Sequence, residues 1–196
     1  MKQTEKASKK RDEIVDKVIA RLNQLDLKEA TVRSICAAAD ISVGTFYHYF
    51  PEKSSLITSI LGRIDIYLTE EIAPQLTSED EIENLIAFGM GFAQYTDGTG
   101  LATGGVISNS NFPLPTAPEE LEAERQRPLY TIPKEILRRG QEKGQVSAGL
   151  DLDEAVDLLI ISLRGHALEW SRRSRMYRVE DKIEKFMYLF ARSLRI

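Results

Sequence analysis

The sequence predicts an all-α protein, and two observations carry that prediction. Apolar residues recur every three or four positions along most of the 196-residue chain, which is the spacing of one buried helix face. No stretch alternates apolar and polar residues in the manner of a half-buried strand. Prolines, glycines and capping residues interrupt the periodic stretches and mark where individual helices begin and end.

Four helices are expected in the N-terminal part of the chain. An apolar stripe that includes Ile14 and Val18 predicts the first of them. Thr31 is typical of an N-cap before a short helix, and Ser42 is suited to cap the next helix after a tight turn. Pro51 ends that helix, because the residue before a proline avoids helical geometry. The four predicted helices span residues 8–25, 32–39, 43–49 and 53–72.

The rest of the chain is also expected to be mostly helical. Pro118 suits the first turn of a helix, and the glutamates that follow it lie where the helix dipole favours negative charge. Pro128 and Pro133 should bend or break that helix. The glycine-rich residues 96–105 and the proline-rich residues 112–118 are expected to be irregular. The helices predicted here span residues 79–95, 106–112, 118–140, 151–174 and 180–194.

The composition favours a cytoplasmic protein. No apolar run approaches the ~20 residues that span a bilayer. The N-terminal stretch lacks the apolar segment of a signal peptide. The one cysteine, Cys36, cannot form an internal disulfide. We therefore expect a cytoplasmic protein without a membrane partner.

Charge is distributed unevenly along the chain. The formal net charge is −4, yet residues 1–60 hold 10 Lys and Arg against 8 Asp and Glu, and the remainder holds 16 against 22. Phosphate binding needs local positive charge rather than a basic protein. Residues 1–8 are expected to form a flexible basic tail. Two roles stay open for it: a solubilising tail, or an arm that follows a phosphate backbone.

Residues 31–50 have the layout of a helix-turn-helix. A short first helix with small side chains can pack closely against a second, and a tight turn at Asp40 and Ile41 separates them. Such a unit presents one face of its second helix to the major groove of DNA. An ordinary helical bundle is the competing interpretation. It does not explain why aromatic residues crowd a short helix that is flanked by serine, glycine, histidine and lysine.

The residue types in this unit suit contacts with DNA. Hydroxyls at Ser42 and Thr45 can bond base edges or phosphates, and Val43 can contact a thymine methyl group. Gly44 lets the backbone approach DNA closely, and the helix N-terminus after Thr31 is a ready anion site. The predicted DNA-binding residues are Thr31, Arg33, Ser42, Val43, Gly44, Thr45, Tyr47, His48, Tyr49 and Lys53.

The same segment resembles the DNA-binding domain of the TetR family of transcriptional regulators. The match runs over residues 31–56, TVRSICAAADISVGTFYHYFPEKSSL, with glycine, hydroxyl, aromatic pair and lysine at the family's offsets. The resemblance implies about nine helices, a homodimer, and repression by operator binding that a small molecule relieves. It implies a DNA-binding domain at residues 1–56 and an effector-binding and dimerisation domain at residues 57–196.

Two positions depart from the family pattern. Asp40 stands where the turn commonly has glycine. Aspartate tolerates left-handed geometry moderately well, so the same turn is expected at a small cost in stability. Tyr49 stands where histidine is usual, with His48 just before it. Which of these two side chains contacts phosphate is left open.

The second domain is expected to dimerise through its last two helices. Residues 151–174 and 178–195 are apolar enough on one side to form a four-helix interface with their symmetry mates. An intramolecular core is the alternative for part of this surface. Two reading heads ~34–36 Å apart would match successive major grooves, which predicts a palindromic operator.

A cavity for a small apolar or aromatic effector is expected in the same domain. Gly89 and Gly91 thin one helix beside large side chains, which could leave space. Core packing is the alternative for each residue taken alone. The candidate effector-binding residues are Phe88, Phe92, Tyr95, Phe112, Tyr130, His166 and Trp170.

Other functional classes find less support. Two histidines and one cysteine cannot supply a zinc site with the usual spacing, and the glycine-rich residues 97–105 lack the Gly-Lys-Ser/Thr of a phosphate loop. We expect no catalytic site, no metal and no cofactor. The alternatives are an effector-independent DNA-binding protein, a helical interaction module and a helical enzyme. The second domain is more than twice as large as the first, which argues against the effector-independent protein.

Overall fold

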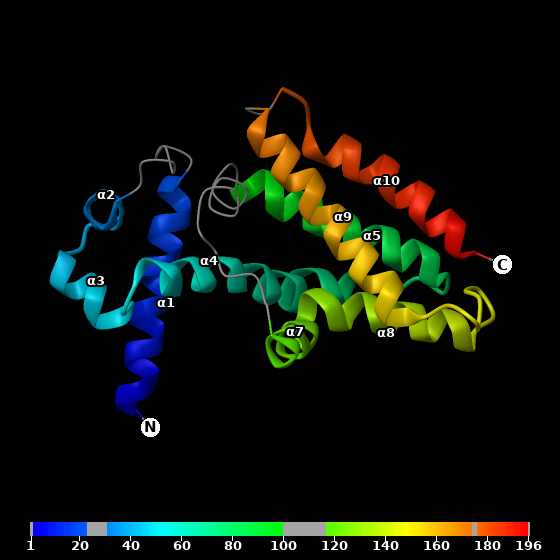
Figure 1. Cartoon of the computed structure of the whole chain (residues 1–196), viewed down its shortest axis with the longest axis horizontal. Helices are drawn as coiled ribbons and strands as arrows, with labels where there is room; N and C mark the ends of the chain where they lie inside the picture. The colour runs from blue at the N-terminus through cyan, green and yellow to red at the C-terminus, as the bar shows by residue number, and fades with distance from the viewer. Residues whose placement is uncertain (1, 23–30, 100–116, 174–175, 196) are drawn as a thin grey trace. The chain divides into compact units, whose positions relative to one another are not determined.

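The structure is a computed structural model that describes residues 2–22, 31–99, 117–173 and 176–195. These ranges contain nine α-helices and no strand, so the all-α prediction is confirmed for them (Figure 1). The helices are α1 (Lys2–Leu22), α2 (Val32–Ala39), α3 (Val43–Tyr49), α4 (Lys53–Tyr67), α5 (Glu81–Thr99), α7 (Pro118–Arg125), α8 (Pro128–Glu142), α9 (Leu152–Arg172) and α10 (Val179–Leu194).

The bounds of α2 and α3 match the predicted ones, and other elements differ. Helix α1 begins at Lys2, so the residues expected as a flexible tail are helical from that point. Helix α5 continues to Thr99, beyond the predicted end at residue 95. The predicted helix over 106–112, together with Phe112, lies outside the described residues.

Two prolines act differently in the helical stretch after residue 117. The helix is interrupted before Pro128, which is the first residue of α8. Proline is favoured at this position because the missing N–H would have no partner within the helix. Pro133 stays inside α8. Its neighbours Leu129, Tyr130 and Ile136 are buried in the core, and this packing offsets the backbone hydrogen bond that a proline cannot donate.

The end of α4 departs from a regular helix. A π-helical turn spans Leu68–Ile72, and a short 3-10 turn follows at Ala73–Gln75, where Pro74 lies. The prediction had one continuous helix over residues 53–72. Leu68 and Ile72 are both buried, so the π turn keeps the two side chains on the core side of the chain.

The described chain forms two compact units. Among the described residues, the first contains those up to Arg63 together with Thr99, and the second contains Ile64–Gly98 and those from 117 onward. The expected division after residue 56 therefore falls inside α4, seven residues before the observed one. Each unit has its own apolar core.

The core of the first unit joins α1 to α4. Phe46 and Phe50 are fully buried, with ring centroids 5.4 Å apart. The Arg63 guanidinium on α4 donates to the Asp12 carbonyl at 2.9 Å and pairs with the Asp16 carboxylate at 2.8 Å, both on α1. These contacts fix the helices that support α2 and α3.

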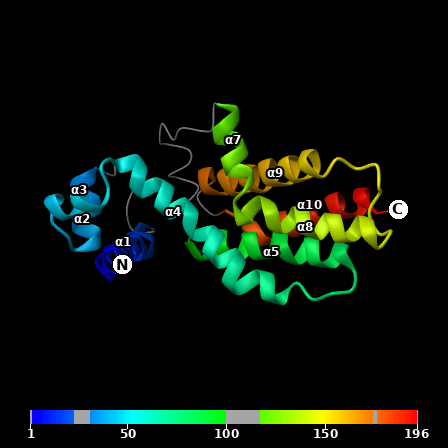
Figure 2. The same ribbon diagram turned by 90° about the horizontal axis from the view of Figure 1, so that it is seen from below.

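The second unit packs α9 against both α8 and α10 (Figure 2). Close approach at two glycines brings α5 against its neighbours. A methyl group added to Gly89 would lie 2.4 Å from Met187 Sδ, and one added to Gly91 would lie 2.7 Å from Ile72. The expectation that these glycines leave an open space is therefore wrong, because Met187 and Ile72 fill it.

A buried carboxylate fastens the start of α5 to the end of α8. Glu81 accepts two hydrogen bonds from Arg139, at 2.9 and 2.8 Å, and one from Lys143 at 2.9 Å. The amide of Asn84 donates a fourth at 3.0 Å. The Glu81 side chain is only 3% exposed, so its charge depends on these partners.

No helix in the described ranges is long and apolar enough to cross a membrane.

Candidate nucleic-acid interface

The turn between α2 and α3 is built from local hydrogen bonds. Thr31 caps α2, its Oγ1 accepting from the Ser34 N–H at 3.2 Å. At the other end Asp40 adopts a left-handed conformation, with φ 56° and ψ 52°. The N–H of Ile41 then donates to the Cys36 carbonyl at 3.0 Å. Aspartate therefore makes the tight turn that the sequence analysis expected.

Asp40 is the one non-glycine residue with a positive φ among the described residues, which leads to a stability prediction. Replacing Asp40 with glycine should stabilise the chain by about 0.5–1 kcal/mol, because glycine adopts this conformation without a steric penalty. Urea unfolding measures the change. Asp40→Ala is the matched control and should destabilise. Equal stability of the glycine and alanine variants would contradict the strain argument.

Helix α3 is capped at its start and anchored by aromatic rings. Ser42 Oγ accepts from the Thr45 N–H at 3.0 Å and lies 2.9 Å from Thr45 Oγ1. Phe46 and Phe50 point into the core of the first unit. The cap and the two buried rings determine which face of the helix remains outside.

The outer face of α3 consists of Val43, Gly44, Tyr47 and His48. All four are exposed, and their spacing places them on one side of the helix. Val43 is 40% exposed and Tyr47 is 52% exposed, which is high for apolar and aromatic side chains. A methyl group added to Gly44 would meet only Ser42 Oγ, at an ordinary 3.7 Å. Nothing inside the first unit therefore requires glycine there.

The structure separates His48 from Tyr49. His48 is exposed, whereas Tyr49 is half-buried against the core of the first unit. The two rings meet edge to face, with centroids 4.8 Å apart. Thr31 and Arg33 at the start of α2 are exposed, as is Lys53 at the start of α4. Thr45 is half-buried beneath the cap.

Two basic residues of the N-terminal segment already have partners. Lys10 pairs with Glu13 at 2.9 Å on the same helix. Arg11 donates to Ser59 Oγ at 2.7 Å and lies over the Phe50 ring, 5.4 Å from its centroid. Arg11 therefore has a packing role between α1 and α4.

The described effector candidates of the second unit are buried in its core or half-buried beside it. Phe88, Phe92, Tyr130 and Trp170 are buried in its core. The Trp170 indole donates to the Tyr177 carbonyl at 2.8 Å, and the Tyr130 hydroxyl accepts from Arg164 at 3.2 Å. Tyr95 and His166 are half-buried, each beside another aromatic ring.

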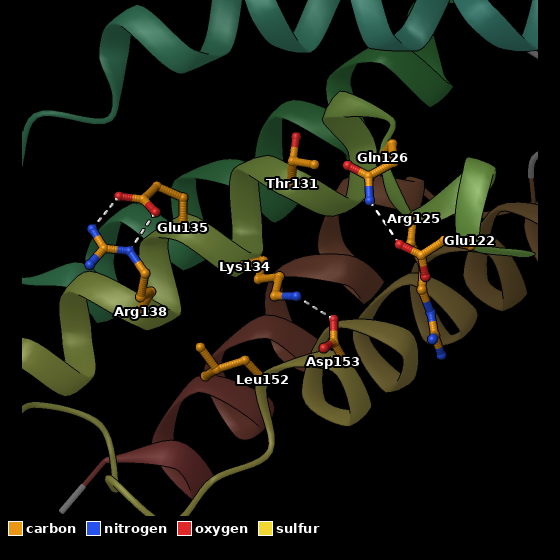
Figure 3. A pocket seen from close by; sticks show the side chains of 9 residues that line it. All are labelled: Glu122, Arg125, Gln126, Thr131, Lys134, Glu135, Arg138, Leu152 and Asp153. Atoms are coloured by element: carbon orange, nitrogen blue, oxygen red, sulfur yellow. Dashed lines mark hydrogen bonds and ion pairs between the residues drawn. The ribbon is translucent and has the colours of Figure 1, made fainter.

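Two pockets on the second unit have other linings. One, of about 300 Å³, lies among α7, α8 and α9, and four of its charged side chains form two pairs, Lys134 with Asp153 at 2.6 Å and Arg138 with Glu135 at 2.7 Å (Figure 3). The other, of about 480 Å³, has an apolar floor that includes Leu76, Ile132 and Ile136. The candidate effector residues line neither pocket. Within the described chain, no cluster of three metal-binding side chains occurs.

An apolar face lies exposed on α9 and α10. Leu158 and Ile161 on α9 are 52% and 67% exposed, and Leu189 on α10 is 73% exposed. Gly165 lies one helical turn after Ile161, and a methyl group added there would meet nothing within 4 Å. Side chains this apolar are unusual on a free surface when they gather on neighbouring helices.

Known proteins resemble this chain in two ways. A model of "Bacterial regulatory proteins, tetR family" matches residues 22–60. The HTH-type transcriptional repressor KstR of Mycolicibacterium smegmatis is 35% identical over 60 residues, which are 31% of this chain and 29% of that protein. This chain thus spans about three tenths of the length of that curated relative.

Solved structures match over nearly the whole fold. The fatty acid degradation regulator FadR from Bacillus halodurans has a TM-score of 0.74 at 20% identity, covering 94% of this chain and 99% of that one. FadR from Bacillus subtilis, in complex with stearoyl-CoA, has a TM-score of 0.73 at 17% identity, covering 91% and 96%.

The capped helices α2 and α3, with the left-handed turn at Asp40 between them, form a helix-turn-helix. Residues 22–60 match the bacterial regulatory proteins of the tetR family, and over the rest of the chain the solved structures share the fold.

Proposed function

We propose that the chain is a transcriptional repressor that binds double-stranded DNA as a homodimer, acts in the cytoplasm and catalyses no reaction. The observation that carries the proposal is the outer face of α3. It holds Val43, Gly44, Tyr47 and His48 outside a helix that a cap and two buried rings fix in place. These side chains are not needed to pack a helical bundle, whereas an exposed helix face of this kind can bind in the major groove.

We propose different contacts for the predicted residues. Val43 and the backbone at Gly44 enter the groove, and Tyr47 and His48 reach phosphates. We assign the phosphate contact to His48 rather than Tyr49, because Tyr49 packs against the core. Ser42 and Thr45 serve first as the cap of α3. Thr31, Arg33 and Lys53 bind the phosphates on either side.

The exposed apolar face on α9 and α10 is proposed as the dimer interface. Leu158, Ile161 and Leu189 would be covered by the same residues of a second copy, as two-fold symmetry requires. A dimer presents two copies of α3, and we therefore propose a palindromic operator.

The second unit is proposed to bind a small apolar or aromatic effector that releases the DNA. The FadR of Bacillus subtilis was solved with stearoyl-CoA, so long-chain acyl-CoA thioesters belong in the panel of compounds to be tested, beside aromatic ones. In the proposed mechanism, effector binding shifts α4, and operator affinity falls. The effect must be reciprocal, because linkage couples the two affinities.

Selection from random double-stranded DNA tests the DNA-binding proposal. The wild-type protein should recover a palindromic sequence, and a duplex carrying it is the operator probe in all experiments below. Failure to enrich any sequence would contradict the proposed function.

Substitution of Tyr47 or Lys53 by alanine tests the assigned contacts. Each variant should bind the operator duplex at least about tenfold more weakly. Each substitution removes one phosphate contact from each of the two DNA-binding units of the proposed dimer. It should therefore also reduce the slope of log affinity against log salt by about two. Lys134→Ala is the control, because Lys134 lies on α8 and pairs with Asp153. Wild-type binding by both test variants would overturn the assignment.

A further inference from the structure

Helix α8 has no N-cap side chain of its own. Its cap position is Arg127, whose side chain makes no capping hydrogen bond, and its first residue is Pro128. The first amide donor of the helix is therefore the N–H of Leu129. A helix start in this condition is stabilised by a nearby carboxylate, which accepts the orphan N–H and complements the helix dipole.

Asp65 of α4 supplies that carboxylate. Its Oδ1 accepts from the Leu129 N–H at 3.3 Å, and its Oδ2 accepts from Arg127 Nε at 2.8 Å. The Asp65 side chain is 16% exposed, so these contacts are partly shielded from water. One side chain of α4 thus caps another helix 64 positions along the chain.

The same contact connects to α9 through a chain of charges. Glu124 at the end of α7 lies 3.7 Å from Arg127 and 2.7 Å from Arg164 of α9. Arg164 follows Ile161 by one helical turn, so it adjoins the apolar face proposed for dimerisation. The charges therefore run from the proposed dimer helix to α4.

We propose that Asp65 is a positioning residue for DNA binding, which holds α4 in place by capping α8. The inference rests on the proposed function. Helix α4 begins at Lys53 in the first unit and reaches Asp65 three residues, or about one turn, before the π turn at Leu68–Ile72. A π turn interrupts the regular hydrogen-bond ladder, so the helix needs a tertiary contact near its end to fix its rotation. Asp65 provides it, and displacement of Arg127 or of the α8 start transmits directly to α4.

Asp65→Ala tests the proposal in the full-length dimer. The variant should bind the operator duplex about tenfold more weakly and should bind a scrambled duplex as the wild type does, because its phosphate contacts are intact. The Leu129 amide should exchange hydrogen faster in the variant. Asp65→Asn keeps an acceptor for that amide but loses the charge. Its affinity for the operator duplex should be about threefold lower than that of the wild type.

Asp157→Ala is the matched control. Asp157 pairs with Arg125 between α9 and α7 and is also half-buried. It should lower stability comparably and leave the ratio of operator to scrambled affinity within about twofold of wild type.

The outcomes separate this inference from the function on which it rests. A wild-type protein without preference for the selected duplex defeats both proposals. Suppose that the wild type prefers the operator duplex to the scrambled one. The positioning role alone is overturned if Asp65→Ala keeps this preference, or if Asp157→Ala loses it to the same extent. If Asp65→Ala does not fold, Asp65→Asn against Asp157→Asn decides by the same ratio.

Discussion

Replacing Ile161 with aspartate should leave the protomer folded and dissociate the dimer. Ile161 is 67% exposed in the protomer, so the substitution should change the free energy of unfolding of one chain by no more than about 0.5 kcal/mol. In the proposed dimer, the carboxylate would be buried without a partner beside its symmetry mate, at a cost of several kcal/mol. Sedimentation equilibrium should then report the 22.1 kDa protomer.

The loss of the dimer should weaken operator binding far more than the loss of any single contact. Two linked heads bind successive half-sites at a high effective concentration, and separating them should lower affinity for the operator duplex about a hundredfold or more. The slope of log affinity against log salt should roughly halve, because half of the phosphate contacts are lost.

Leu121→Asp is the control for this experiment. Leu121 is also an exposed apolar residue, at 39%, but it lies on α7 rather than on α9 or α10. It should leave both the mass and the operator affinity unchanged. A dimer that survives Ile161→Asp would show that the interface lies elsewhere, whether or not DNA binding persists.

The helix-turn-helix could be predicted closely because local chemistry determines it. Thr31 and Ser42 are capping residues, and each accepts the backbone bond that its position predicts. Pro51 ends α3 through a steric effect on its immediate neighbour. The bounds of α2 and α3 follow from these short-range effects alone.

The second unit was harder because its determinants are separated in sequence. Phe88 and Trp170 are residue types expected in a cavity lining. However, a helix face has the same apolar sequence pattern whether it contacts a ligand or another helix. Gly89 suggested a space that Met187 fills from α10. The cap of α8 by Asp65 also joins residues that no local pattern connects.

Glu81 is the second residue with a large expected effect, on stability. Glu81→Gln should lower the free energy of unfolding at pH 7 by about 3 kcal/mol. Hydrogen bonds from Arg139, and further ones from Asn84 and Lys143, lower the pKa of the Glu81 carboxyl to about 2 despite its burial. Glutamine cannot balance the two cations, which keep only more distant carboxylates: Glu135 at 4.0 Å from Arg139 and Glu79 at 3.8 Å from Lys143.

The pH dependence follows from the direction of that pKa shift. A carboxyl group whose pKa is lower in the folded state stabilises the fold fully above its unfolded value, near 4.5, and loses this contribution as pH falls toward 2. The difference in stability between wild type and Glu81→Gln should therefore be constant from pH 7 to about 5 and shrink below that. Urea unfolding at pH 7, 5, 4 and 3 measures it.

Glu135→Gln distinguishes a buried carboxylate from an exposed one. Glu135 pairs with Arg138 on the same helix, but its side chain is 47% exposed, and such pairs contribute about 0–1 kcal/mol. Its substitution should change stability by less than about 0.5 kcal/mol at any of these pH values. Burial, rather than the presence of an arginine partner, sets the size of the effect. If Glu81→Gln and Glu135→Gln lowered the free energy of unfolding at pH 7 by similar amounts, this explanation would be refuted.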